Sequence, residues 1–156
     1  MSEGAYQASG RYFEEYSIGD TIVTVGRTIT EADVVQFAGL TGDYNQIHTN
    51  REYASQHMFG QRVAHGLLVL AISVGLATRT GIIEGTVLAF RELDWKFSRP
   101  VLINDTTHAQ LEVIDIKPLP RLGGGNITLK VSVYNQHNEV VQRGHWQMLV
   151  QSKPEV

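Results

Sequence analysis

The chain has 156 residues and no cysteine, which fits one domain of common size and excludes disulfide scaffolds, thiolate nucleophiles and cysteine-ligated zinc. Sixteen acidic and thirteen basic residues give a formal net charge of −3. Because no block of lysine and arginine is present to follow a phosphate backbone, nucleic acid is not an expected partner.

The first residues are polar and acidic rather than basic and then apolar, so we expect no secretory leader. The longest apolar run, residues 66–77, is too short to cross a bilayer and has no flanking basic cluster. We therefore expect a cytoplasmic protein without a membrane partner. Residues 1–11 lack periodicity and predict a flexible tail, followed by one domain at 12–151.

The first expected elements of this domain are a strand and a helix. β-Branched residues at 21–29 predict the strand. Thr30 is followed three residues later by Asp33, as in a capping box, and an apolar face follows. This pattern predicts a helix that begins at Thr30 and ends near Gly39. Asn50 is expected to cap a short helix through Ala54.

A longer helix is expected over residues 63–80. This segment is apolar on nearly every side, which is typical of a helix buried all round at the centre of a core. Gly75 would let another backbone approach closely, and Gly81 is placed to end the helix.

Beyond this helix the hydrophobic period changes to two, which predicts strands near 93–97, 110–113, 127–133 and 140–150. Turns are expected at Pro100, 118–120, 123–125 and 135–138. The expected order of elements is one strand, then helices, then about four strands of roughly ten residues. This order contains no alternating βαβ unit. The order predicts an α+β fold in which an antiparallel sheet curls around one buried helix.

Two side chains in the loop at 40–48 are candidates for acid/base chemistry. Asp43 and His48 are five residues apart, and both groups can be tuned to exchange a proton near neutral pH. The alternative is an ordinary Asx turn of Asp43 with Asn45, beside an exposed histidine. A calcium loop is rejected, because its sixth position is His48 instead of glycine and its twelfth is Ala54 instead of glutamate.

His65 and Gly66 open the long apolar segment. A glycine in the first helical turn exposes main-chain N–H groups that could hold an oxyanion, while the alternative is a glycine needed only for packing. We expect His65 to be a structural, hydrogen-bonded residue. The other histidines have no metal-site spacing, so no metal is expected; they are His57, His108, His137 and His145.

The residues TGDYNQIH at 41–48, Ala54, and AHGLL at 64–68 resemble the signature of MaoC-like dehydratases and R-specific enoyl-CoA hydratases. The resemblance extends loosely over about residues 12–150. It implies a hot-dog fold, in which an antiparallel sheet wraps around the helix at 64–80. It also implies a hydro-lyase, which adds water to a trans-2-enoyl-CoA thioester to give R-3-hydroxyacyl-CoA or catalyses the reverse dehydration.

The resemblance further implies a role for each site residue. Asp43 and His48 would hold the reacting water, and either could be the acid or the base. Asn45 would brace the loop, and the N–H of Gly66 would bond the thioester oxygen. His65 and Leu67 would contact the substrate. No metal or redox cofactor is implied, because CoA or acyl carrier protein is part of the substrate.

Two residues depart from the family pattern and leave the acyl group open. Gln46 stands where proline is usual in the family, and Val74 stands where several relatives have serine. An unusual acyl group, such as a branched or dicarboxylic one, therefore stays among the expected substrates. Two other functions remain: dehydration of 3-hydroxyacyl groups on acyl carrier protein, and non-catalytic binding of acyl thioesters. The intact Asp43–His48 pair argues against simple binding. The resemblance also implies a homodimer or a higher homo-oligomer.

Overall fold

The computed structural model describes residues 8–154, and an antiparallel sheet dominates them. The strands are β1 (Thr21–Val23), β2 (Arg27–Thr28), β3 (Val87–Phe97), β4 (Thr106–Leu119), β5 (Gly124–Tyr134) and β6 (Val140–Gln151). Their order is β1-β4-β5-β6-β3, and β2 also pairs with β4. The helices are α1 (Glu31–Thr41), α2 (Gln46–Thr49), α3 (Arg51–Ser55) and α4 (Gly66–Arg79), with 3-10 turns η1 (Phe13–Glu15) and η2 (Pro120–Leu122).

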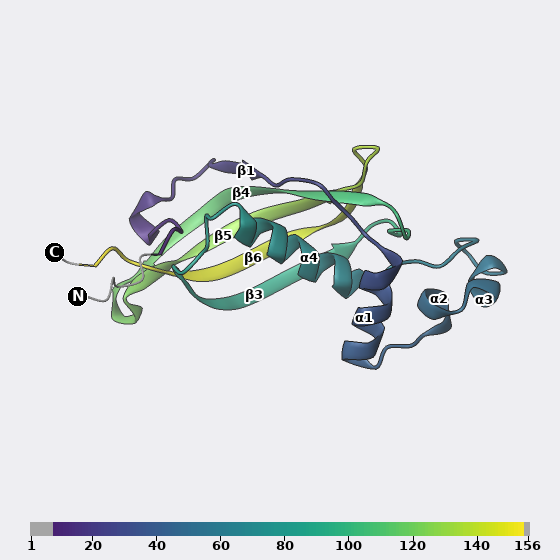
Figure 1. The fold of residues 1–156 in the computed structure, drawn as a ribbon. Helices are drawn as coiled ribbons and strands as arrows, with labels where there is room; N and C mark the ends of the chain where they lie inside the picture. The colour runs from purple at the N-terminus through teal and green to yellow at the C-terminus, as the bar shows by residue number, and fades with distance from the viewer. Residues whose placement is uncertain (1–7, 155–156) are drawn as a thin grey trace, which may run out of the picture.

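Helix α4 lies against one face of the sheet, while α1, α2 and α3 gather beyond one end of it (Figure 1). Val69 and Ala77 of α4 are fully buried, and they belong to the same core as Leu111, Val131 and Trp146 of the sheet. Burial of these side chains is the main force that holds helix and sheet together. The predicted α+β fold, an antiparallel sheet around one helix, is confirmed.

The prediction that this helix is buried all round is wrong. One side of α4 faces away from the sheet: Leu67 is 61% exposed, and Ala71 and Gly75 are also exposed. A Cβ atom on Gly75 would meet nothing within 4 Å, so no backbone approaches it within the described residues. A single sheet covers only one side of a helix, and the apolar composition cannot say how many sides are covered.

The expected strand at 21–29 is interrupted between β1 and β2. At Thr24 a side chain takes the place of a backbone acceptor in the pairing with β4. Its Oγ1 accepts a 2.9 Å hydrogen bond from the backbone N–H of Ala109. Only the last residues of the tail expected at 1–11 are described. Residues 1–7 lie outside the described residues, but Gly10 and Arg11 donate backbone hydrogen bonds to Glu84 and Ile82 at 2.8 and 2.9 Å.

The turn expected at 123–125 lies slightly earlier, at η2 and Gly123. Gly124 and Gly125 are buried in β5, where an added Cβ would lie 1.9 Å from the Val150 carbonyl oxygen and 2.2 Å from the Phe13 ring, respectively. Close packing, rather than a turn, therefore requires these two glycines. The turn predicted at 135–138 is confirmed between β5 and β6.

Candidate active site

Asp43 follows directly after the end of α1. Thr30 and Asp33 form the predicted capping box at the start of this helix, and Gly42 ends it with a φ of 78°, three residues beyond the predicted end at Gly39. The backbone N–H of Asn45 then donates to Asp43 Oδ1 at 3.2 Å, which makes an Asx turn. The turn is therefore present, and it leaves Oδ2 of Asp43 free to face His48.

His48 lies in α2, which is a helix of one turn. The prediction of an irregular loop at this position is therefore wrong. Asn45 caps this helix by accepting a 3.3 Å hydrogen bond from the N–H of Ile47. The side chain of His48 is buried, and its Nδ1 lies 2.7 Å from the Val63 carbonyl oxygen. Because a carbonyl can only accept, Nδ1 must carry a hydrogen, which leaves a lone pair on Nε2 when the ring is neutral.

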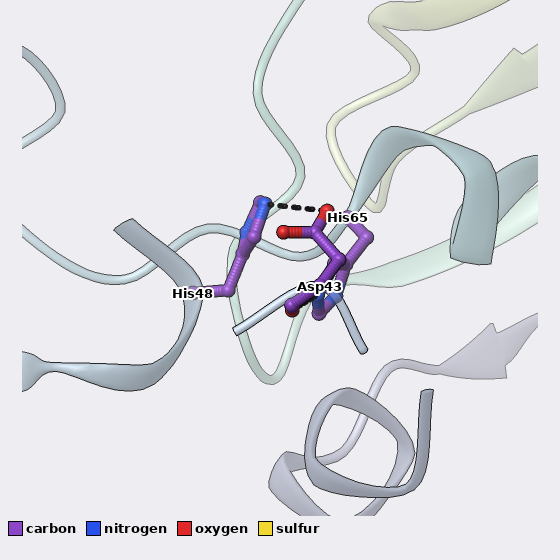
Figure 2. A group of neighbouring side chains, drawn as sticks. All are labelled: Asp43, His48 and His65. Carbon is purple, nitrogen blue, oxygen red and sulfur yellow. Dashed lines mark hydrogen bonds and ion pairs between the residues drawn. The ribbon is translucent and has the colours of Figure 1, made fainter. Parts of the chain in front are cut away.

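Asp43 and His48 face each other across a gap. His48 Nε2 lies 4.0 Å from Asp43 Oδ2, which is too long for a direct hydrogen bond (Figure 2). An ionised carboxylate and an unprotonated ring nitrogen are both acceptors. One water that donates to both, through bonds of about 2.8 Å, would span about 4.4 Å between them. The pair has the spacing and polarity to hold one water molecule.

The surroundings of His48 favour its neutral form. Burial lowers the pKa of His48 below its ordinary value of 6.5, and the neighbouring His65 ring lowers it further. The hydrogen bond to Val63 and the charge of Asp43 act in the opposite direction but do not reverse the shift. His48 is therefore neutral at pH 7, with its Nε2 lone pair available.

His65 supports this pair from behind, as Figure 2 shows. It is 2% exposed, its Nε2 donates a 2.9 Å hydrogen bond to the main-chain carbonyl of Asp43, and its ring stacks on His48 with centroids 3.8 Å apart. Its Nδ1 is buried and has no hydrogen-bond partner among residues 8–154. The prediction of a structural, hydrogen-bonded His65 is confirmed.

Gly66 begins α4 beside the ring of Phe97. A Cβ atom at Gly66 would lie 2.7 Å from two carbons of that ring, so tight packing requires a glycine here. The first N–H groups of a helix have no partner within the helix, and the helix dipole gives this end a partial positive charge. The start of α4 can therefore stabilise a developing negative charge.

A cavity of about 430 Å³ connects His48 with Gly66. Most of its lining is apolar, from Phe59, Val63, Ala64, Phe97, Pro100 and Val101, and the remaining residues are Ser98, Arg99 and Gln142. His65 and Leu67, which were expected to contact the substrate, do not line this cavity: His65 is buried behind Asp43, and Leu67 points to the surface.

Within the described part of the chain, Asp43, His48 and His65 are the group whose side chains could hold a metal ion. Their ligand atoms lie within 4.8 Å of one another. Tetrahedral zinc places its ligand atoms about 3.4 Å apart, closer than the 4.0 Å between His48 Nε2 and Asp43 Oδ2. These side chains would have to move inward to bind zinc.

Comparison with known proteins identifies the family. Residues 14–135 match the family model described as MaoC like domain. The (R)-specific enoyl-CoA hydratase of Rhodospirillum rubrum is 37% identical over 108 residues, which cover 69% of this chain and 72% of the relative. The match to Protein MaoC of Klebsiella aerogenes is 36% identical over 65% of this chain, but spans only 30% of that longer protein.

The solved structure of a monoamine oxidase regulatory protein from Archaeoglobus has a TM-score of 0.86 and 36% identity, and the match covers 93% of this chain and 97% of that protein. The chain belongs to the MaoC-like family, and its sheet wrapped around α4 is the hot-dog fold. Within residues 8–154, no helix is both long enough and apolar enough to cross a membrane.

Proposed function

We propose that the protein is a hydro-lyase that adds water to a trans-2-enoyl-CoA thioester to give R-3-hydroxyacyl-CoA, or catalyses the reverse dehydration. The observation that carries this proposal is the 4.0 Å gap between two hydrogen-bond acceptors, His48 Nε2 and Asp43 Oδ2. The gap lies beside an apolar cavity that ends at the start of α4. Water addition to an enoyl thioester needs these features together.

The proposed reaction places the bound water against C3 of the enoyl group. As the water oxygen adds to C3, one member of the Asp43–His48 pair takes one of its protons, and the other proton stays on the new hydroxyl group. The proton that was taken is then delivered to C2 with the help of the other member. The electrons of the C2–C3 double bond move toward the thioester oxygen during the addition. The N–H of Gly66, at the start of α4, bonds that oxygen and stabilises its charge.

Neighbouring residues have supporting roles in this proposal. Asn45 braces the site by capping the helix that carries His48, and His65 holds the backbone of Asp43. Arg99 lines the cavity and has Glu139 as an ion-pair partner at 3.5 Å. The guanidinium group of Arg99 is suited to bind a phosphate group, which is present both in CoA and in the phosphopantetheine arm of acyl carrier protein. No metal or redox cofactor takes part in the proposed reaction.

We also propose a homodimer. Strand β3 ends the sheet order and leaves one edge without a strand partner among the described residues. Four of its apolar side chains are 43–55% exposed: Leu88, Phe90, Leu93 and Phe97. The uncovered side of α4, with Leu67 and Gly75, is a second apolar surface. A second copy that pairs along β3 would cover both surfaces.

The test is to follow the absorbance of the conjugated thioester after mixing the purified protein with crotonyl-CoA. The proposal predicts loss of the enoyl signal and formation of R-3-hydroxybutyryl-CoA, identified by chiral chromatography. Binding of crotonyl-CoA without any loss of signal, repeated with branched, dicarboxylic and carrier-protein-linked enoyl thioesters, would instead support a non-catalytic binding module.

A further inference from the structure

One side chain from β6 holds the beginning of α4. Gln142 is 2% exposed, and its Nε2 donates a 3.0 Å hydrogen bond to the main-chain carbonyl of Gly66. Its Oε1 accepts a 2.9 Å hydrogen bond from the indole Nε1 of Trp95 on β3. A buried glutamine is unusual in a strand whose other inward-facing residues include Trp146 and Met148.

The chemistry of the two partners fixes the orientation of this amide. An indole N–H can only donate a hydrogen bond, and a main-chain carbonyl can only accept one. The oxygen of Gln142 must therefore face Trp95, and its nitrogen must face Gly66. Breaking either bond would leave a buried polar group without a partner, which is costly. The side chain is consequently locked in one position.

This locked side chain is adjacent to the proposed reaction. Gln142 lines the same cavity as His48, and Gly66 is packed against the Phe97 ring. Phe97 is opposite Gln142 in the register of β3 and β6. The carbonyl of Gly66 is thus held by Gln142, and the Cα of Gly66 is packed against the Phe97 ring from the neighbouring strand. Movement of the α4 start is restricted at two points.

We propose that Gln142 is a positioning residue for the oxyanion site, and that Trp95 sets its orientation. The inference rests on the proposed hydration activity, because only then does the start of α4 meet a developing charge. A donor stabilises an oxyanion well only when it lies about 2.7–3.1 Å from the final position of the oxygen. Gln142 keeps the first turn of α4 at that position without touching the reacting atoms.

Two variants of Gln142 separate positioning from folding. Gln142→Leu keeps the approximate volume but removes both bonds, and is expected to lower kcat at least about tenfold with a smaller change in KM. Gln142→Glu is isosteric. Its ionised form cannot donate to Gly66, whereas its protonated form can. Its activity relative to the unmodified protein should therefore recover as the pH falls.

The matched control is Gln147→Leu. Gln147 is half-buried on the same strand, and its Oε1 accepts a 3.3 Å hydrogen bond from Asn126, away from the cavity. This variant should keep kcat. Trp95→Phe should lower kcat in the same direction as Gln142→Leu, and the double variant should lose little more than Gln142→Leu alone, because both residues act through one hydrogen-bonded chain.

Hydrogen exchange of the Val69 backbone amide, which donates to the His65 carbonyl at the start of α4, gives a readout that does not require turnover. Gln142→Leu should speed exchange there more than Gln147→Leu does. If the unmodified protein has no hydratase activity but exchange changes in this way, the proposed function fails while the structural restraint stands. If turnover is present and both Gln142 variants match Gln147→Leu at every pH, the positioning proposal is overturned.

Discussion

His65 donates a 2.9 Å hydrogen bond to the main-chain carbonyl of Asp43, although the two residues are 22 positions apart in the chain. The same imidazole stacks on His48. One buried ring therefore fixes the backbone of Asp43 and the plane of the His48 ring. The spacing of the proposed catalytic pair depends on a residue that does not face the gap between them.

The acid limb of the pH–rate profile should report His48. Because burial lowers its pKa, half-protonation of the required neutral ring should occur below the ordinary value of 6.5. We expect kcat/KM for crotonyl-CoA to fall at acid pH, with the midpoint of the fall below 6.5. A limb centred above 6.5 in kinetic assays would contradict the assignment.

The same shift predicts a pH-dependent free energy of unfolding. The unfolded chain binds a proton at His48 near pH 6.5, whereas the folded chain binds it only at lower pH. The contribution of neutral His48 to the free energy of unfolding is fully present above pH 6.5. It is lost as the pH falls through the lowered pKa of the folded state. Urea unfolding should show a shallower slope in this window for His48→Asn than for the unmodified protein.

A methyl group at Gly66 should damage the site. In Gly66→Ala the new Cβ would lie 2.7 Å from the Phe97 ring, which must shift and change the cavity, so we expect at least about a tenfold loss of kcat/KM. Gly39→Ala in α1 is the control, because its Cβ would lie 3.6 Å from the nearest atom, Tyr44 Oη. That variant should gain up to about 1 kcal/mol in stability and keep its activity. Equal activity of both variants would disprove the steric account.

The proposed dimer predicts a different response from two exposed leucines. Leu67→Glu places a charge on the uncovered side of α4 and should shift the protein toward monomer in sedimentation velocity experiments. Leu40→Glu, at a position that is 84% exposed near the end of α1, should leave the oligomeric state unchanged. A monomeric unmodified protein, or a dimer that survives Leu67→Glu, would exclude this contact surface.

Metal removal should leave the reaction intact. The proposed mechanism uses water held by two side chains, so dialysis against EDTA is expected to keep kcat unchanged. Added Zn²⁺ should inhibit, because it binds the same imidazole and carboxylate acceptors that hold the water. Loss of activity in EDTA with recovery on adding a divalent cation would show that the Asp43, His48 and His65 group is a metal centre instead.

Local sequence patterns predicted the features that depend on neighbouring residues. The Thr30–Asp33 capping box and the Asn50 cap each require contacts over three residues, and both form as expected. Strand alternation likewise indicated the long strands. One-turn α2 is too short to produce a periodic pattern, and the break at Thr24 depends on a partner 85 residues away. A short stretch of sequence therefore cannot predict either the α2 helix or the break at Thr24.

The cavity lining was largely missed for the same reason. Phe97 and Gln142 are opposite each other in the β3–β6 register, but the sequence does not give that register or its position relative to α4. The available signal was one glutamine, Gln142, among inward-facing residues of β6 that are otherwise apolar, such as Trp146 and Met148. The extent of α4 exposure was also not predictable, because an apolar side can face either a core or a second subunit.

The most direct test compares two Asp–His pairs in the same protein. Asp94 and His145 form an exposed pair at 2.8 Å on β3 and β6, outside the residues that line the cavity, and supply matched controls. With crotonyl-CoA as substrate, Asp43→Asn and His48→Asn should each lower kcat/KM by at least about 100-fold without loss of folding. Asp94→Asn and His145→Asn should remain active. Folded Asp43 and His48 variants that hydrate crotonyl-CoA as fast as the Asp94 and His145 variants would contradict the proposed catalytic pair.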